Sequence, residues 1–353
     1  MHGGDIYRNK VHMDFSVNVN PLGIPEEVMK VLERSVRKAE AYPDPDCEEL
    51  KQAITEHFGL KPEQVVCGNG ASELLLAICR WKKPGKALLP APGFSGYRKV
   101  LQTVKCGWKE YPLPEEQDFT LTDETLTSFL EVLQKGNYDI LFLTNPSNPT
   151  GALLKKEMLL KIARFCEKNK ILLILDECFV ELTKAPAEYS FVSELERFRH
   201  VCILRAFTKS FAIPGIRLGY VLCKDPKDAK AIEKELPEWN VSLPAQMAGV
   251  AAMKETKYLE KSREVIRTER NWLKRRLEEL GTKVYPSKTN FLLFHTEQTD
   301  LYERLLEQGI LIRDCEDYVG LGKGYYRIAV KQHAENEELI QKMSNIMDKE
   351  IDI

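Results

Sequence analysis

Short apolar runs alternate with amphipathic, helix-like segments between residues 65 and 223. Apolar runs of this length are typical of buried strands, whereas apolar residues spaced three and four positions apart, as in 155–169, are typical of helices that cover a sheet. The alternation predicts an α/β fold in which helices cover both faces of a mostly parallel sheet. The runs that we interpret as strands are 65–67, 87–89, 140–144, 171–175, 201–204 and 218–223.

The pattern changes after residue 225, where long helical stretches replace the alternation, the longest being 256–280. Strand-like runs and a last helix follow, and together they predict a smaller α+β domain. We therefore expect a large domain over residues 31–225 and a C-terminal small domain over residues 226–353. The strand-like runs of the small domain lie near 291–294, 310–313 and 325–330, and its last helix begins at about 335.

Composition and charge exclude several classes of protein. The chain has 353 residues, of which 43% are hydrophobic, so it is long enough for more than one domain and a large buried core. Its net charge of −2 favours neither nucleic acid nor an anionic membrane surface as a partner. Nine cysteines without a CxxC pair fit reduced cytoplasmic thiols better than disulfides or a metal site. Because no signal-peptide pattern and no apolar run of membrane-spanning length is present, we expect a cytoplasmic protein.

Lys209 and Arg217 stand eight residues apart in the run 205–220, and Pro214 and Gly215 lie between them. An amine and a guanidinium in this arrangement suit an aldehyde cofactor that bears a phosphate, because the amine condenses with the aldehyde and the guanidinium holds the anion. The pair therefore indicates pyridoxal phosphate. A solvated lysine beside an unrelated arginine is the competing interpretation.

Asp176 follows the apolar run 172–175, which places it at the carboxyl end of a predicted buried strand. Open α/β sheets bind ligands at that edge, so Asp176 is suited to pair with the pyridinium nitrogen of the cofactor and to keep it protonated. The protonated ring is an electron sink. An aspartate that only caps the next helix is the alternative.

Two loops complete the expected cofactor site. The Gly-rich turn before the helical pattern at 74–78 offers a phosphate the backbone N–H groups of Gly70 and Ala71, the positive end of a helix and the Ser72 hydroxyl. Such turns also occur without a ligand. In the loop 145–151, Pro149 keeps Asn148 extended, so we assign the Asn148 amide to the cofactor's phenolic oxygen.

These four motifs, in this order, resemble those of the fold-type I pyridoxal-phosphate enzymes of the aminotransferase class I and II group, and the resemblance covers nearly the whole chain. It implies an N-terminal arm, residues 1–30, that packs with the small domain. It also implies a homodimer in which Tyr42 reaches the cofactor phosphate of the neighbouring subunit, with a core tyrosine as the alternative. The segments 2–6, 14–23, 311–315, 320–322 and 325–330 are most similar to threonine-phosphate decarboxylases and, less closely, to histidinol-phosphate aminotransferases.

The resemblance further implies residues that bind substrate. Arg327, in a strand pattern, clamps a substrate anion, usually the carboxylate, and Arg313 at the end of the preceding strand pattern adds a second guanidinium. Solvated arginines are the alternative. His2 begins a His-Gly-Gly sequence that forms part of the substrate-phosphate pocket in the decarboxylases, although terminal residues are usually loose. Asn20 and Gly23 line the amino-acid end of the substrate, since glycine permits a close approach of the backbone.

Phe94 takes the place of the aromatic residue that stacks on the pyridine ring, although an ordinary core phenylalanine fits the sequence equally well. The chain departs from the wider group at two positions. Ala206 stands where a serine or threonine usually donates to the cofactor phosphate, which leaves Thr208 and Ser210 as nearby hydroxyls. Phe179 stands where many aminotransferases carry a tyrosine; histidinol-phosphate aminotransferases resemble the tyrosine version, and threonine-phosphate decarboxylases resemble this one.

We therefore expect a cytoplasmic, homodimeric, pyridoxal-phosphate-dependent enzyme that acts on a phosphorylated amino acid. The preferred reaction is decarboxylation of L-threonine O-3-phosphate to (R)-1-aminopropan-2-yl phosphate for cobamide synthesis, with Lys209 as the acid/base that reprotonates carbon. A histidinol-phosphate aminotransferase or a related amino-acid aminotransferase is the first alternative, because the bond that breaks depends on how the substrate is held. A cofactor-binding regulator without catalysis is the remote alternative.

Overall fold

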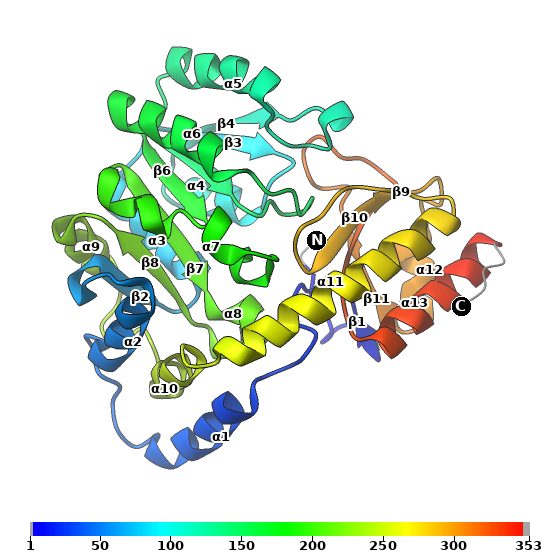
Figure 1. Cartoon of the computed structure of the whole chain (residues 1–353), viewed down its shortest axis with the longest axis horizontal. Helices are drawn as coiled ribbons and strands as arrows, with labels where there is room; N and C mark the ends of the chain where they lie inside the picture. The colour runs from blue at the N-terminus through cyan, green and yellow to red at the C-terminus, as the bar shows by residue number, and fades with distance from the viewer. Residues whose placement is uncertain (1–2, 349–353) are drawn as a thin grey trace.

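The computed structural model describes residues 3–348 of the chain. A large sheet with its helices and a smaller sheet with its helices lie side by side, and α11 (Thr256–Glu279) extends from the first part along the second (Figure 1). Within the described residues, no helix combines the length and the apolar character that a membrane crossing requires.

The large sheet has seven strands in the order β2-β8-β7-β6-β5-β3-β4. β8 runs antiparallel to both of its neighbours, and all other neighbouring strands are parallel. The mostly parallel sheet that the alternation predicts is therefore confirmed. The strands are β2 (Val65–Gly68), β3 (Lys86–Ala91), β4 (Gly107–Pro112), β5 (Ile140–Thr144), β6 (Leu172–Asp176), β7 (Val201–Ala206) and β8 (Gly219–Cys223).

The strands predicted from apolar runs do not include β4. This strand lies at the edge of the sheet beside β3, and none of its residues is buried. An edge strand with solvent on its open side has no need of an apolar run, so hydrophobic periodicity does not mark it.

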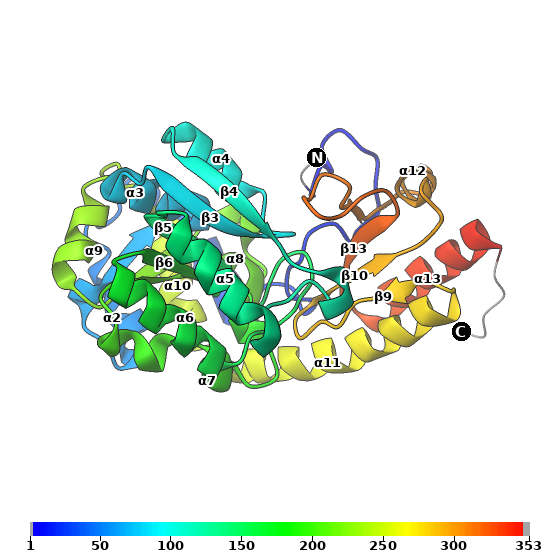
Figure 2. The ribbon, with the colours of Figure 1, turned by 90° about the horizontal axis from the view of Figure 1, so that it is seen from above.

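Helices cover both faces of the large sheet (Figure 2). On one face, α3, α4 and α9 pack against alternate strand residues such as Phe142 and Ile174; on the other, α2, α5 and α6 pack against the intervening ones, such as Leu141 and Leu173. A strand between two helical layers must be apolar on both sides, which explains its unbroken apolar run. These helices are α2 (Glu48–Phe58), α3 (Ala71–Lys82), α4 (Gly96–Thr103), α5 (Asp123–Lys135), α6 (Lys156–Asn169) and α9 (Pro226–Glu233), and the short α7 (Pro186–Tyr189) follows β6.

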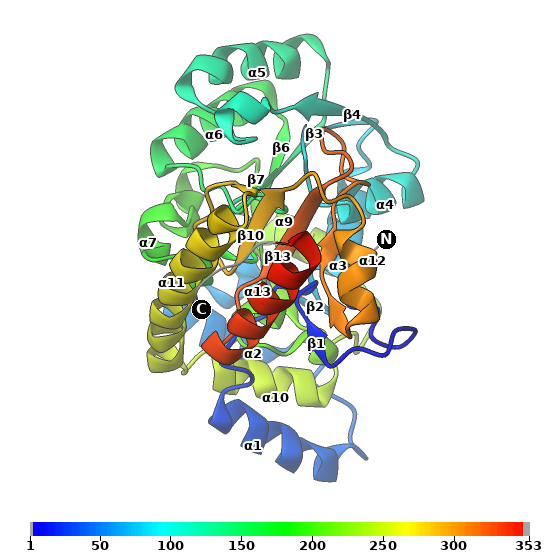
Figure 3. The same ribbon diagram turned by 90° about the vertical axis from the view of Figure 1, so that its right-hand side faces the viewer.

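The small part is built on a four-stranded antiparallel sheet in the order β12-β13-β10-β9. α11, α12 (Leu301–Glu307) and α13 (His333–Met347) share its apolar core, which includes Phe294 and Tyr326 (Figure 3). A separate parallel pair joins β1 (Met13–Asp14) to β11 (Ile310–Leu311), so this segment of the N-terminal region is tied to the small part. The four strands of the sheet are β9 (Lys283–Val284), β10 (Phe291–His295), β12 (Arg313–Asp314) and β13 (Tyr325–Ala329).

The contacts of three helices bear on where the two domains divide. α10 (Leu243–Ala252) packs against α1 (Glu26–Ser35) and α2, and α9 packs against α3 and β8. Because these contacts are made with the large part, we propose that the large domain extends to about residue 255, beyond the boundary expected at 225. We also propose that α1 belongs to it, so that the arm is shorter than residues 1–30.

Candidate active site

A cavity of about 260 Å³ opens at the carboxyl ends of β6 and β7, where open α/β sheets bind their ligands. Side chains from both parts of the molecule line it, so most of the predicted site residues come together there. From the large part these are Ala71, Ser72, Phe94, Asn148, Asp176, Thr208, Lys209 and Arg217, and from the small part they are Arg313 and Arg327.

Lys209 lies in α8 (Phe207–Ser210), a single turn that begins directly after β7. Burial, and then the positive charges of Arg327 and Arg217, lower the pKa of the Lys209 amine to about 8. Its Nζ lies 5.9 Å from the centroid of the Phe179 ring. Only the neutral form of an amine is a nucleophile, and a lysine with this pKa is partly neutral at physiological pH. The surroundings therefore prepare Lys209 to attack a carbonyl group.

Asp176 is the last residue of β6, and its carboxylate is buried and hydrogen-bonded on both oxygens. The backbone N–H of Cys178 donates to Oδ1 (3.0 Å), and the hydroxyl of Tyr97 donates to Oδ2 (2.7 Å). The first bond is the local contact that the capping interpretation anticipates. The carboxylate can accept further hydrogen bonds beyond this one, because each ionised oxygen accepts about two. Asp176 thus lines the cavity with acceptor capacity left for a cationic ring nitrogen.

Arg217 lies over the first turn of α3. Gly70 caps this helix with a φ of +78°, and a Cβ atom added at Gly70 would lie 2.5 Å from Arg217 Nη2. Glycine is therefore favoured here by the backbone conformation, and its lack of a side chain leaves room for the guanidinium. Within residues 3–348, no carboxylate lies within ion-pairing distance of Arg217, whose Nη1 donates to the Pro214 carbonyl (3.3 Å). The guanidinium and the positive end of α3 together form a site suited to a phosphate.

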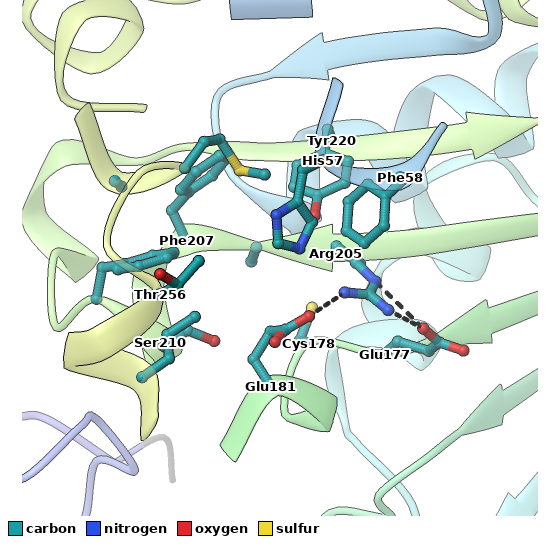
Figure 4. Close-up of a pocket in the computed structure, with 15 residues that line it drawn as sticks. His57, Phe58, Glu177, Cys178, Glu181, Arg205, Phe207, Ser210, Tyr220 and Thr256 are labelled. Atoms are coloured by element: carbon teal, nitrogen blue, oxygen red, sulfur yellow. Dashed lines mark hydrogen bonds and ion pairs between the residues drawn. The ribbon is translucent and has the colours of Figure 1, made fainter. Parts of the chain in front are cut away.

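The two hydroxyl side chains of α8, Thr208 and Ser210, line different pockets. Thr208 lines the cavity of Lys209. Ser210 instead lines a second, smaller pocket (Figure 4). In that pocket the buried Arg205 pairs with Glu177 (2.6 Å) and with Glu181 (2.5 Å). Thr208 is therefore the hydroxyl of this pair that is available beside Ala206.

Arg313 and Arg327 reach the cavity from neighbouring strands, where they are directly opposite each other in the register of β12 and β13. Both side chains are buried. Arg327 donates through Nη1 to Asn148 Oδ1 (2.5 Å) and through Nη2 to the Ser16 carbonyl (2.8 Å). Arg313 Nη2 donates to the carboxylate of Asp317. The two guanidiniums give the small-domain side of the cavity the character of an anion site.

Other predicted residues lie elsewhere. The side-chain amide of Asn20 donates to the Ser210 carbonyl (2.8 Å) and to Ser262 Oγ (2.7 Å), so it ties the N-terminal region to α8 and does not line the cavity. Gly23 does not line it either, and a φ of +76°, not a close approach, accounts for the glycine. Tyr42 is 78% exposed. His2 lies outside the described residues.

Tyr97, Asn18 and Asp317 contact site residues directly, although the sequence patterns do not single them out. Tyr97 lies in the first turn of α4, three residues after Phe94, and no sequence pattern marks it. The Asn18 amide, oriented so that its oxygen faces donors, accepts from Nε (3.2 Å) and Nη1 (3.3 Å) of Arg327. Asp317 follows Arg313 by four residues in an irregular segment, and no periodic pattern marks it.

Comparisons with known proteins agree with this geometry. Residues 10–343 match the family model described as aminotransferase class I and II. The chain is 35% identical over 338 residues to threonine-phosphate decarboxylase of Salmonella typhimurium, covering 95% of this chain and 91% of that protein. It is 32% identical over 330 residues to histidinol-phosphate aminotransferase of Methanosarcina mazei, covering 92% and 85%. The solved histidinol-phosphate aminotransferase from Clostridium acetobutylicum matches with a TM-score of 0.87 and 30% identity, covering 95% of this chain and 99% of that chain.

Proposed function

The chain belongs to the aminotransferase class I and II family, and from this membership we propose that it decarboxylates L-threonine O-3-phosphate to (R)-1-aminopropan-2-yl phosphate. As a member of this family it is a pyridoxal 5'-phosphate-dependent enzyme. When bound, the cofactor supplies an electron sink for the bond that breaks at the substrate's Cα. The protein's own residues select that bond by the way they hold the substrate.

The large-domain side of the cavity fits this cofactor. Lys209 supplies the amine, and Asp176 supplies the buried anion for the ring nitrogen. We assign the cofactor phosphate to the first turn of α3 (Gly70, Ala71 and Ser72), to Thr208 and to Arg217, one face of the ring to Phe94, and the phenolic oxygen to Asn148. Asn148 has its Oδ1 turned to Arg327, which leaves its Nδ2 as the donor.

The observation that carries the proposed substrate is the convergence of Arg313 and Arg327 on the cavity of Lys209. L-Threonine O-3-phosphate carries a carboxylate and a phosphate on one molecule, and two guanidiniums match two anions. We assign the carboxylate to Arg327 and the phosphate to Arg313. The relative from Salmonella typhimurium, which is named for this reaction, supports the assignment.

A histidinol-phosphate aminotransferase is the second candidate, because proteins of that name match at 32% and 30% identity. Phe179 weighs against it. The ring lines the cavity beside Lys209 and offers no hydroxyl where the resembled aminotransferases carry a tyrosine. A regulator without catalysis is disfavoured by the family, because the similar proteins are named as a decarboxylase and an aminotransferase, which are enzymes.

Replacing Arg313 or Arg327 with lysine should weaken the binding of L-threonine O-3-phosphate by about 10- to 100-fold, because lysine keeps the charge but loses the planar fork. L-Threonine is the matched control ligand, since it lacks only the phosphate. Arg313→Lys should leave its KM nearly unchanged, whereas Arg327→Lys should raise the KM of both ligands. Equal losses of the two ligands in Arg313→Lys would contradict the assignment and favour an aminotransferase of unphosphorylated amino acids.

The apoprotein should capture pyridoxal phosphate covalently at a rate that rises with pH up to about 8 and then levels off, because Lys209 must lose its proton before it attacks. Below that pH the rate should fall by about tenfold for each pH unit. Arg327→Gln removes a positive charge that lowers this pKa, so the midpoint should move upward. Stopped-flow absorbance over a pH series measures it, and a midpoint below pH 7 or a flat profile would contradict the role of Lys209.

We also propose that the enzyme is a cytoplasmic homodimer whose product serves cobamide synthesis. Tyr42 and Trp239 support the dimer. Their rings contact each other at the surface, with centroids 4.9 Å apart, although they are 78% and 44% exposed. An exposed aromatic pair of this kind is typical of a surface that a partner covers, and it leaves Tyr42 available to the cofactor site of a second copy.

A further inference from the structure

Asp317 forms an ion pair with Arg313, the residue to which the proposed function assigns the substrate phosphate. Both oxygens of its carboxylate accept from Arg313 Nη2, at 2.7 and 3.0 Å. The Arg313 side chain is 5% exposed, whereas that of Asp317 is 42% exposed. Arg313 lines the cavity and Asp317 does not, so the carboxylate approaches the guanidinium from outside the cavity.

Asp317 and its neighbour Tyr318 both contact the Arg313 guanidinium. The Tyr318 ring lies beside it, with 5.2 Å between Arg313 Cζ and the ring centroid. An arginine that recognises a phosphate monoester typically does so through two parallel N–H···O bonds. Because Arg313 Nη2 donates to Asp317, the two terminal nitrogens of Arg313 are not both available to bind a phosphate in the cavity.

The backbone that carries Asp317 is anchored independently of its side chain. The Tyr318 N–H donates to the Cys315 carbonyl (3.0 Å), and the Leu321 N–H donates to the Tyr318 carbonyl (3.0 Å). Arg98 of α4, in the large part, donates to the Asp317 carbonyl (3.3 Å). These bonds hold the backbone of segment 315–321 without using the Asp317 carboxylate, so breaking the ion pair with Arg313 does not remove the bonds that fix the segment.

We propose that Asp317 is a built-in counterion of the anion subsite: it neutralises Arg313 in the absence of substrate, and a phosphate monoester has to displace it. The choice of a phosphate as the displacing anion rests on the proposed function. Every ligand that uses Arg313 then binds with an affinity reduced by the fraction of molecules in which Asp317 holds the guanidinium. A ligand that does not use Arg313 is unaffected. Asp317 is therefore a specificity-determining residue, because it keeps weak anions from the subsite.

Calorimetric titration of the holoenzyme with inorganic phosphate tests this proposal. Asp317→Asn should bind phosphate about fivefold more tightly than the wild type, the gain expected when a half-exposed competing ion pair is removed. Asp317→Glu keeps the carboxylate and should stay close to the wild type. Glu316→Gln is the matched control, because Glu316 is an exposed neighbour that forms no ion pair within residues 3–348. Thermal melting of each variant checks that it is folded.

Arg313→Gln supplies the second arm of the test. In that background Asp317→Asn should bring no gain, because the counterion has no charge left to neutralise. The proposal is overturned if Asp317→Asn binds phosphate no more tightly than the wild type, if Glu316→Gln gains as much, or if the gain persists without Arg313. Turnover of L-threonine O-3-phosphate by the same variants is a separate readout: a gain in phosphate affinity without turnover supports the counterion and contradicts the proposed function.

Discussion

Replacing Lys209 with alanine should abolish covalent attachment of pyridoxal phosphate and reduce turnover by at least about 10³-fold. Lys209 is the single lysine among the described residues that line the cavity, so no neighbouring amine is placed to take its role. Its pKa of about 8 reflects burial beside Arg327 and Arg217, and an exposed lysine lacks these surroundings. The variant loses both the nucleophile that holds the cofactor and the acid/base that returns a proton to carbon.

Borohydride reduction of the holoenzyme, followed by peptide mapping, tests this expectation directly. The label should fall on the peptide that contains Lys209 and should be absent from the alanine variant. Lys184→Ala, which removes an exposed lysine in the bend before α7, is the control and should label and turn over like the wild type. A label on any other lysine would contradict the assignment of Lys209 as the residue that binds the cofactor covalently.

Replacing Asp176 with asparagine should leave the fold nearly intact but reduce kcat by about 10²- to 10³-fold. The carboxylate is buried at the end of β6, and its negative charge favours the protonated cofactor ring; a neutral amide of the same shape does not. Measuring kcat together with the cofactor's affinity separates chemistry from binding. If the variant binds the cofactor and turns over like its parent, Asp176 is structural.

Tyr97→Phe is the matched control for Asp176. It removes the hydroxyl that donates to Oδ2 (2.7 Å) but leaves the carboxylate charge in place. We expect it to lose much less activity than Asp176→Asn, because one donor is lost while the anion beside the ring nitrogen is kept. Similar losses in the two variants would indicate that orientation, and not charge, is what Asp176 contributes.

The part of the site that lies on the large sheet could be predicted from the sequence. β6 and β7 lie between two helical layers, so they carry unbroken apolar runs whose ends are easy to locate. Asp176 ends β6, and Lys209 follows the end of β7 by three residues. Residues at strand ends of a parallel sheet meet at one edge, which is why local patterns located two side chains that are far apart in the sequence.

The features that the sequence did not predict depend on the direction of a side chain or on contacts between residues that are distant in the sequence. Thr208 and Ser210 are equivalent in the sequence, and only the path of α8 decides that Thr208 faces the cavity. The resemblance predicts that Asn20 faces substrate, but its amide donates to the Ser210 carbonyl and to Ser262 Oγ, which are distant in the sequence. Asp317 reaches Arg313 through an irregular segment, where no period relates a residue to its direction.

Incubation of the purified holoenzyme with L-threonine O-3-phosphate, in the absence of any keto acid, separates decarboxylation from transamination. We expect release of one carbon dioxide for each molecule of 1-aminopropan-2-yl phosphate formed. Parallel incubation with histidinol phosphate and 2-oxoglutarate should consume no keto acid. Consumption of 2-oxoglutarate with histidinol phosphate, without release of carbon dioxide from threonine phosphate, would contradict the account and identify the enzyme as an aminotransferase.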